Sequence, residues 1–149
     1  MSKQSDIYDE LVTQLETVLP DHHRLHNPYD LEENDENFLR QGWGIAISSG
    51  SNSNRTFCPK ISIQRNYNII ITRQYYALQH DAVAKAVTEK QLLEDQLLLI
   101  ENLCNNTELS GNTGHVIFET DGGIERIFGA KDQYMALQTI YRTEIFEET

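Results

Sequence analysis

YMALQTIYRTEIF, residues 134–146, is the stretch that decides the fold predicted for this chain. Apolar and polar residues recur along it with the period of two that a β-strand requires. One face carries Met135, Leu137, Thr139, Tyr141, Thr143 and Ile145, and the other carries Tyr134, Ala136, Gln138, Ile140, Arg142, Glu144 and Phe146. Because each face is half apolar, we expect a strand that is covered on both sides. One cover is the core of its own subunit, and the second is a neighbouring molecule unless the segment is an ordinary central strand.

The first half of the chain predicts one helix followed by strands. Residues 6–19 have apolar residues at helical spacing and stop at Pro20, which indicates an amphipathic helix. Residues 41–48 alternate as a half-buried strand does, and the polar run 50–54 reads as a loop. Residues 55–77 are rich in strand-forming residues, with a polar break at Arg65-Asn66 that predicts a turn.

The second half predicts a long helix and a hairpin before the final strand. A capping box at Thr88 and Gln91 precedes an apolar run, so residues 82–104 are expected to be helical. The helical spacing is carried by Leu93, Leu97, Ile100 and Cys104, with Leu92, Leu99 and Leu103 beside them. His115 to Glu119 predicts a strand, and Asp121-Gly122-Gly123 predicts the hairpin turn that follows it.

These elements together predict an α+β fold, with a mixed, largely antiparallel β-sheet and two main helices packed against it. A chain of 149 residues is long enough to bury one core, so residues 1–149 are expected to form a single domain. Flexible or elaborated segments are expected around residues 21–37, 50–56 and 105–114.

The charge of the chain is −11 and is unevenly distributed. Residues 1–40 carry a net charge of −7, residues 41–80 carry +4 without a single acid, and residues 81–149 carry −8. An acidic chain is a poor candidate for gripping nucleic acid, because phosphate neutralisation needs clustered lysines and arginines. The basic middle either docks an acidic surface of a neighbour or faces acids of its own domain or water. Its cations are Arg55, Lys60, Arg65 and Arg73.

Membrane and secretion signals are not found in the sequence. The N-terminus becomes acidic at once, and apolar runs such as Leu97 to Ile100 are far too short to span a bilayer. Cys58 and Cys104 are isolated, which is typical of buried thiols in a reducing compartment.

The stretch DHHRLHNPYDLEEND, residues 21–35, contains three histidines and five carboxylates and is the one candidate for a metal site. His22 and His26 have the spacing of a helical zinc motif, but no glutamate base lies between them. A calcium loop counted from Asp30 lacks its glycine and its final glutamate. We interpret the segment as a charged, solvated connection whose histidines, His22, His23 and His26, can be replaced with little effect on folding.

No catalytic or phosphate-binding motif is present, so we expect no catalytic, cofactor-binding or metal-binding residues. A small metal-dependent or thiol enzyme remains an alternative that rests only on the histidine cluster and Cys58.

The whole layout resembles the tail terminator proteins of long-tailed bacteriophages, also called tail completion or head-to-tail joining proteins. The resemblance runs over about residues 6–147, in the order of these segments: IYDELVTQLETVLP (7–20), NPYDLEENDENFLRQGWGIAIS (27–48), RTFCPKISIQRNYNIIITRQ (55–74), TEKQLLEDQLLLIENL (88–103) and YMALQTIYRTEIFEE (134–148). It implies a tail-terminator-like sheet with packed helices, assembled as a six-fold ring that caps the tail tube and ends its polymerisation. The implied partners are further copies of the chain, the tail tube protein and the head connector or completion protein, with DNA passing through the ring.

The resemblance also implies a structural protein without enzymatic activity, located in the tail-neck region of the virion after assembly in the host cytoplasm. An acidic lumen would repel the DNA backbone and let it slide. As interface residues we expect the four cations of the basic middle together with Tyr141, Ile145 and Phe146. The second hypothesis is a small acidic secretion chaperone that binds an extended effector segment as a dimer. Such chaperones usually end on a helix, whereas this chain is predicted to end on a strand.

Overall fold

The computed structural model describes residues 3–29, 31, 34, 36–54, 60–75, 82–104, 116–128 and 133–148. Within them the helices are α1 (Lys3–Val18), α2 (Glu36–Leu39) and α3 (Ala82–Cys104). The strands are β1 (His23–Arg24), β2 (Gln41–Asn54), β3 (Lys60–Tyr75), β4 (Ile117–Phe128) and β5 (Gln133–Glu148). The predicted loop 105–114, Arg55 and Cys58 lie outside the described residues.

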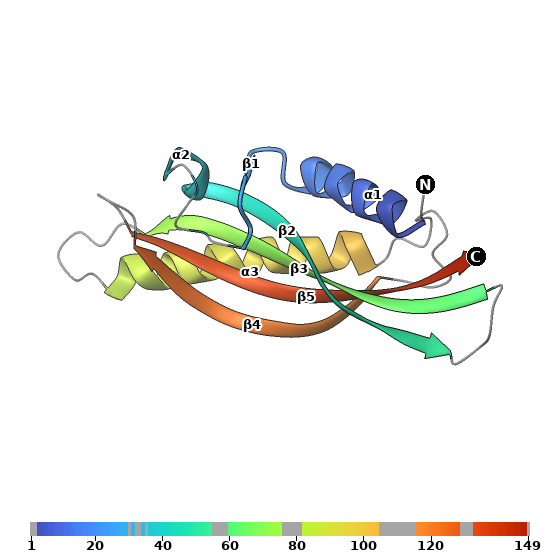
Figure 1. Cartoon of the computed structure of the whole chain (residues 1–149). Helices are drawn as coiled ribbons and strands as arrows, with labels where there is room; N and C mark the ends of the chain where they lie inside the picture. Colours follow the sequence, from blue (N-terminus) through green and yellow to red (C-terminus); the bar gives the residue numbers. More distant parts are fainter. Residues whose placement is uncertain are drawn as a thin grey trace.

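All the described strands belong to one sheet in the order β1-β2-β3-β5-β4 (Figure 1). The short β1 runs parallel to β2, and every other neighbouring pair is antiparallel. Two long helices pack against this sheet, so the predicted α+β fold with a mixed, largely antiparallel sheet is confirmed. The final strand, predicted at residues 134–146, is β5 and pairs with both β3 and β4.

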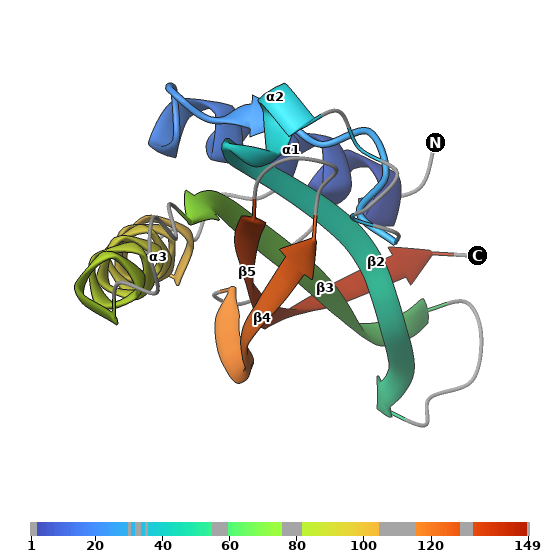
Figure 2. The same ribbon diagram turned by 90° about the vertical axis from the view of Figure 1, so that its left-hand side faces the viewer.

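The main core lies between one face of the sheet and the two long helices (Figure 2). α1 contributes Ile7, Leu11 and Leu15, which recur every fourth residue on one side of the helix and are fully buried. The other contributors are residues of β2, β3, α3 and β5, including Trp43, Tyr67, Ile69, Ile71, Leu92, Leu99, Leu103, Met135, Leu137 and Tyr141. Hydrophobic burial of this continuous cluster holds both helices on the same face of the sheet.

A second, smaller core covers the opposite face of the sheet at one end. After β1 the chain crosses the sheet edge, and the amide of Leu25 donates a hydrogen bond to the carbonyl of Trp43 at 2.8 Å. Leu25 and Leu39 then pack over Ile70, Tyr134 and Ala136. At this end β5 is therefore covered on both faces, as predicted, and both covers come from the chain itself.

The segments that form the second core lie so close to β2 that position 42 must be a glycine. A β-carbon there would lie 2.5 Å from the carbonyl oxygen of Phe38 and 2.9 Å from Cδ2 of Leu25. These distances are shorter than any van der Waals contact, so only hydrogen fits between β2 and the segment above it.

The predicted turn at Arg65-Asn66 is wrong. β3 runs unbroken from Lys60 to Tyr75, with Arg65 opposite Thr143 and Asn66 opposite Arg142. The long β5 supplies a partner at every position, so the polar pair is carried in register without a bend. The polar run 50–54, predicted as a loop, is likewise the end of β2, although the pairing with β3 shifts between Ile47 and Gly50.

The predicted hairpin turn at Asp121-Gly122-Gly123 is also wrong. β4 continues through it to Phe128, and its pairing with β5 shifts register between Asp121 and Gly123. Gly123 has a φ of 82°, and its amide donates to the carboxylate of Asp121. This is the geometry of a β-bulge. A bulge needs a glycine with positive φ, as many turns do, but the strand continues beyond it.

Candidate functional site

Both outer edges of the sheet are open within the described residues. β4 is the last strand on one side, and no described strand pairs with its outer edge. On the other side β1 pairs only with Gly42 and Trp43, so β2 has no described partner strand beyond that point. An open strand edge presents unpaired backbone donors and acceptors, which makes it a natural place for contact with another chain.

The far ends of β2 and β3 extend past the helices as an arm. We define the arm as residues 48–54 of β2 and residues 60–66 of β3. Figure 1 shows the arm extending past one end of α3, and Figure 2 shows α3 and the arm on opposite sides of the protomer. The arm carries Lys60 and Arg65 and no acidic residue, so it is the basic part of an acidic protein.

The predicted basic interface residues take different positions. Arg55 is outside the described residues. Lys60 is the first residue of β3, and the structure does not describe its side chain. Arg65 is half-buried on the arm, and its guanidinium donates to the carbonyl of Ser48 at 3.5 Å. Arg73 lies at the opposite end of β3 and is bound to Asp95 of the same chain. The structure therefore separates Arg73 from the arm.

The predicted interface residues of the final strand are also divided. Tyr141 is fully buried in the main core, where the ring of Phe118 packs edge-on at 6.3 Å between centroids. Burial raises the pKa of its phenol well above the ordinary value, so this group stays protonated. Ile145 and Phe146 pair with Ile63 and Ser62 of the arm, and their side chains are not described. Tyr141 supports the sheet, and a direct contact with a neighbour remains a prediction for the other two.

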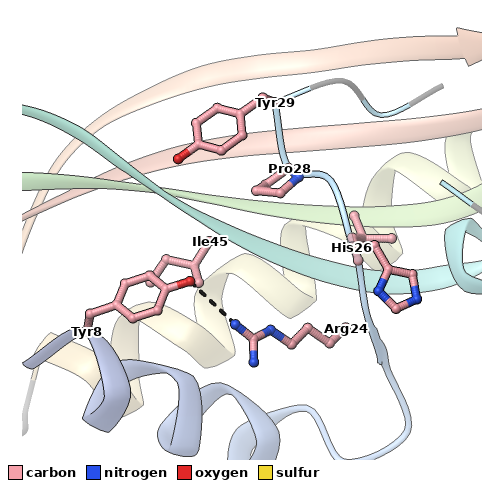
Figure 3. Close-up of a pocket in the computed structure, with 7 residues that line it drawn as sticks. Tyr8, Arg24, His26, Pro28, Tyr29 and Ile45 are labelled. Carbon is pink, nitrogen blue, oxygen red and sulfur yellow. Dashed lines mark hydrogen bonds between the residues drawn. The ribbon is translucent and has the colours of Figure 1, made fainter. Parts of the chain in front are cut away.

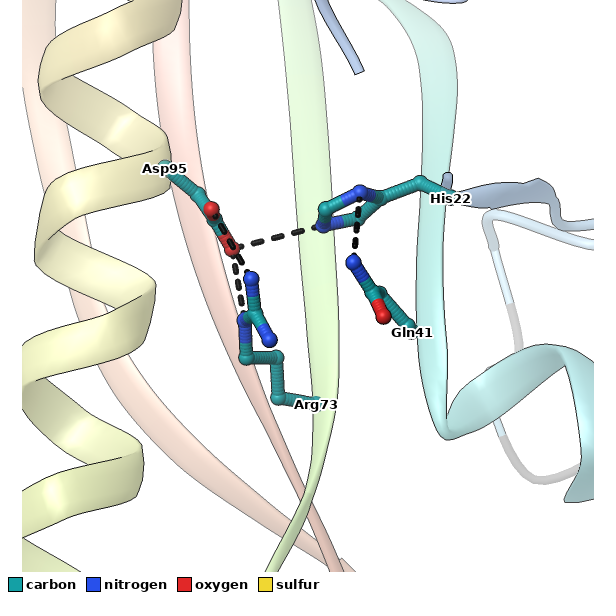
Figure 4. Close-up of polar contacts among 4 residues, drawn as sticks. All are labelled: His22, Gln41, Arg73 and Asp95. Carbon is teal, nitrogen blue, oxygen red and sulfur yellow. Dashed lines mark hydrogen bonds and ion pairs between the residues drawn. The ribbon is translucent and has the colours of Figure 1, made fainter. Parts of the chain in front are cut away.

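A polar network on the α3 side of the sheet joins four segments of the chain (Figure 4). The carboxylate of Asp95 on α3 accepts bonds from Arg73 of β3 at 2.8 and 3.1 Å. The same carboxylate lies 3.3 Å from Nε2 of His22, and Nδ1 of that ring lies 3.3 Å from the amide nitrogen of Gln41. Burial opposes ionisation of Asp95, but the bonds from His22 and Arg73 outweigh it and lower the pKa of the carboxyl.

This network corrects the interpretation of the histidine cluster as a solvated connection. The side chain of His22 is only 4% exposed and belongs to the network. His23 and His26 instead pack against the ring of Phe38, with centroids 5.3 and 5.2 Å away. Among the described residues, no three histidine, cysteine or carboxylate side chains gather closely enough to hold a metal ion.

The position of Asp95 on its helix is a sequence signal of this network. Asp95 follows Leu92 by three residues and precedes Leu99 by four, so it shares the buried face of a helix with them. A carboxylate on an apolar face needs a cation or several donors. That argument predicts a partner for Asp95, although it does not say which one.

A hollow of about 520 Å³ opens between α1, β1 and β2 (Figure 3). Inside it the guanidinium of Arg24 donates to the hydroxyl of Tyr8 at 3.4 Å. The same guanidinium also lies 5.7 Å from the ring centre of Trp43, which does not line the hollow. The remaining lining residues are Leu25, His26, Pro28, Tyr29 and Ile45. None of these described lining residues is a serine, a cysteine or a carboxylate, so the hollow offers an aromatic surface and a cation without an assembled nucleophile.

α3 exposes apolar residues next to the β4 edge. Leu93 and Leu97 are 49% and 55% exposed, whereas Leu92, Leu99 and Leu103 of the same helix are buried. Leu93 and Leu97 begin the stripe that defined the predicted helix. In the structure, the leucines beside this stripe face the core, and part of the stripe itself is exposed to solvent.

Comparisons with known proteins include a distant structural likeness. No protein-family model matches the sequence, and no curated protein matches it. The fold is similar to that of a chain in the virion of a native gene transfer agent particle, with a TM-score of 0.47 and 13% sequence identity. The match covers 97% of this chain and 93% of that chain. This likeness is too remote to place the protein in a family. Separately, none of the helices in the described ranges is long and apolar enough to cross a membrane.

Proposed function

We propose that this protein is a structural virion protein of a long-tailed bacteriophage, acting as a ring that caps the tail tube. The ring ends polymerisation of the tube and joins the tail to the head connector, and DNA passes through its hole. Its partners are further copies of the chain, the tail tube protein and the head completion protein. It works in the tail-neck region of the virion and has neither an enzymatic reaction nor a membrane target.

The observation that carries the proposal is the pair of open sheet edges on opposite sides of one protomer. β4 ends the sheet on one side, and β2 beyond Trp43 ends it on the other. Single-chain proteins usually keep such edges short or covered, since an open edge invites pairing. A protomer with different contact surfaces on opposite sides associates head-to-tail, and head-to-tail contacts close into a ring when the rotation between neighbours permits.

Two further features agree with this role. The structure keeps the broad succession on which the resemblance rests, namely a first helix, sheet strands, a long helix and a final strand, although residues 60–75 form one strand instead of the two predicted. The net charge of −11 suits a passage for DNA, because acidic walls repel phosphates and prevent the strand from sticking.

A tube-growth assay tests the proposed function. Purified protein is added to polymerising tail tube subunits, and the lengths of the tubes are measured by electron microscopy. We expect growth to stop and tubes to carry a cap at one end, in proportion to the protein added. An acidic protein of similar size and charge serves as the control. Unchanged tube growth, together with a stable dimer that binds an extended peptide, would contradict the proposal and favour the secretion chaperone.

A further inference from the structure

Helix α3 has two apolar faces, and the described part of the chain buries one of them. Leu92, Leu99 and Leu103 face the sheet and are at most 1% exposed. Leu93 and Leu97 lie one turn apart on an adjacent face and remain about half exposed. A helix with apolar residues on more than one side normally packs against more than one neighbour.

The second face of α3 runs alongside the open edge of the sheet. The amide nitrogen of Gln96 lies 3.0 Å from the carboxylate of Asp121 on β4. At the other end of the helix, Cys104 lies close to the backbone of Phe118. These two contacts place α3 alongside the edge strand, so its exposed leucines and the exposed apolar residues of β4 form one surface. We call it the α3–β4 surface, and its members are Leu93, Leu97, Phe118 and Ile124.

We propose that the α3–β4 surface binds the arm of a second copy of this chain, in a head-to-tail contact. The inference deepens the proposed function and rests on it, because it names the two surfaces that close the ring. The two surfaces lie on opposite sides of the protomer, with α3 on one side and the ends of β2 and β3 on the other (Figure 2). A contact between opposite sides leaves one of each surface free for the next copy, as a ring requires.

Charge selects the arm over other parts of a second copy. Exposed acids flank the α3–β4 surface on the helix, where Glu94 and Glu101 outnumber the exposed Lys90. The arm brings Lys60 and Arg65 and no acid. A symmetric contact between two α3–β4 surfaces would instead place these carboxylates against their own copies, and such like-charge contacts cost several kcal/mol.

Photo-crosslinking from position 97 tests the contact directly. Leu97 is replaced by a benzophenone amino acid, and cross-linked peptides are identified by mass spectrometry in the free protein and on tail tubes. We expect cross-links to residues 48–66 of another copy, which span the arm. The same probe at Leu98, about 100° further round the helix and also exposed, is the matched control and should give few. Cross-links between two α3 helices, or none between copies in either sample, would overturn the inference.

A charge placed on the surface gives a second measurement. Leu97→Glu should weaken association between copies about tenfold or more, because the carboxylate would be buried at the contact. Leu98→Glu should change it less than about threefold, and both variants should melt like the wild type since both side chains are exposed. Equal effects of the two substitutions on association would overturn the inference. Weaker tube capping with unchanged association would also overturn it and assign this surface to the tube protein, while the proposed function would stand.

Discussion

The guanidinium of Arg73, on β3, and the carboxylate of Asp95, on α3, form a two-point ion pair at 2.8 and 3.1 Å. His22, from the connection after α1, adds a third contact to the same carboxylate. One buried acid therefore fixes the long helix to the sheet and the N-terminal connection to both.

Replacing Asp95 by Asn should lower the free energy of unfolding by about 2–4 kcal/mol, because it leaves a largely buried guanidinium without its counter-charge. The measurement is chemical denaturation of the wild type and the variant. Glu94→Gln is the matched control, since Glu94 is the preceding residue on the same helix and is exposed. A loss of stability no larger than in the control would show that the ion pair contributes nothing net.

The same pair predicts how stability depends on pH. The pKa of Asp95 is lowered from its ordinary value of 3.8, so its carboxylate stabilises the fold fully above that value. The contribution is lost as the pH falls through the lower pKa of the folded state. The difference in unfolding free energy between the wild type and Asp95→Asn should therefore shrink as the pH is lowered from about 3.8. A difference that stays constant below that pH would contradict the assignment.

His22 should be the one sensitive histidine of the cluster. His22→Ala removes a buried ring that bridges Asp95 and Gln41, and we expect a loss of about 1–2 kcal/mol. His23→Ala and His26→Ala remove ring contacts with Phe38 at exposed positions and should each cost less than about 1 kcal/mol. Thermal or denaturant unfolding of the three single variants measures the ranking. Equal effects would restore the interpretation of a solvated connection.

Gly42→Ala should destabilise the chain by about 1–3 kcal/mol, because the new methyl group overlaps the carbonyl of Phe38. Gly44→Ala is the matched control on the same strand. Its methyl group would meet Cβ of Pro28 at 3.2 Å, a tight contact that a small shift relieves. Comparable melting temperatures for the two variants would argue against the close packing of the second layer on β2.

The fold was predictable where local pattern decides it and unpredictable where pairing does. Residues 82–104 form a helix and residues 134–146 a strand because their apolar residues keep one period throughout. The polar pair Arg65-Asn66 and the glycines after Asp121 looked like turns, but a continuous β5 holds both β3 and β4 extended past them. Whether a polar break becomes a turn depends on the partner strand, which a single sequence does not identify.

The candidate site shows the same limit more strongly. His22 and Asp95 are 73 residues apart, and only the packing of the connection beside α3 brings them together. On α3 the leucines of both faces have helical spacing, so periodicity alone could not tell Leu92 and Leu99 from Leu93 and Leu97. The position of the sheet decides which of these leucines are buried. We propose that the other face of the helix serves assembly.

Reversing the charges of Lys60, in the arm, and of Arg55, which directly follows the β2 part of the arm, should weaken assembly. We expect Arg55→Glu combined with Lys60→Glu to reduce association between copies and to reduce its sensitivity to salt, because close charge pairs would be lost. Arg73 is left unchanged, since its reversal would break the pair with Asp95 and confuse stability with binding. Sedimentation at low salt and at about 0.5 M salt, where charges are strongly screened, measures both effects. Unaffected association at low salt would make these residues a solvated face.

Cryo-electron microscopy of tail tubes assembled in the presence of this protein tests the proposed ring most directly. We expect tubes that end in a closed ring of six copies, with the α3–β4 surface of each copy against the arm of the next and an open central passage. Tubes that end without this protein, or a protein that stays a dimer with its arms free, would contradict it.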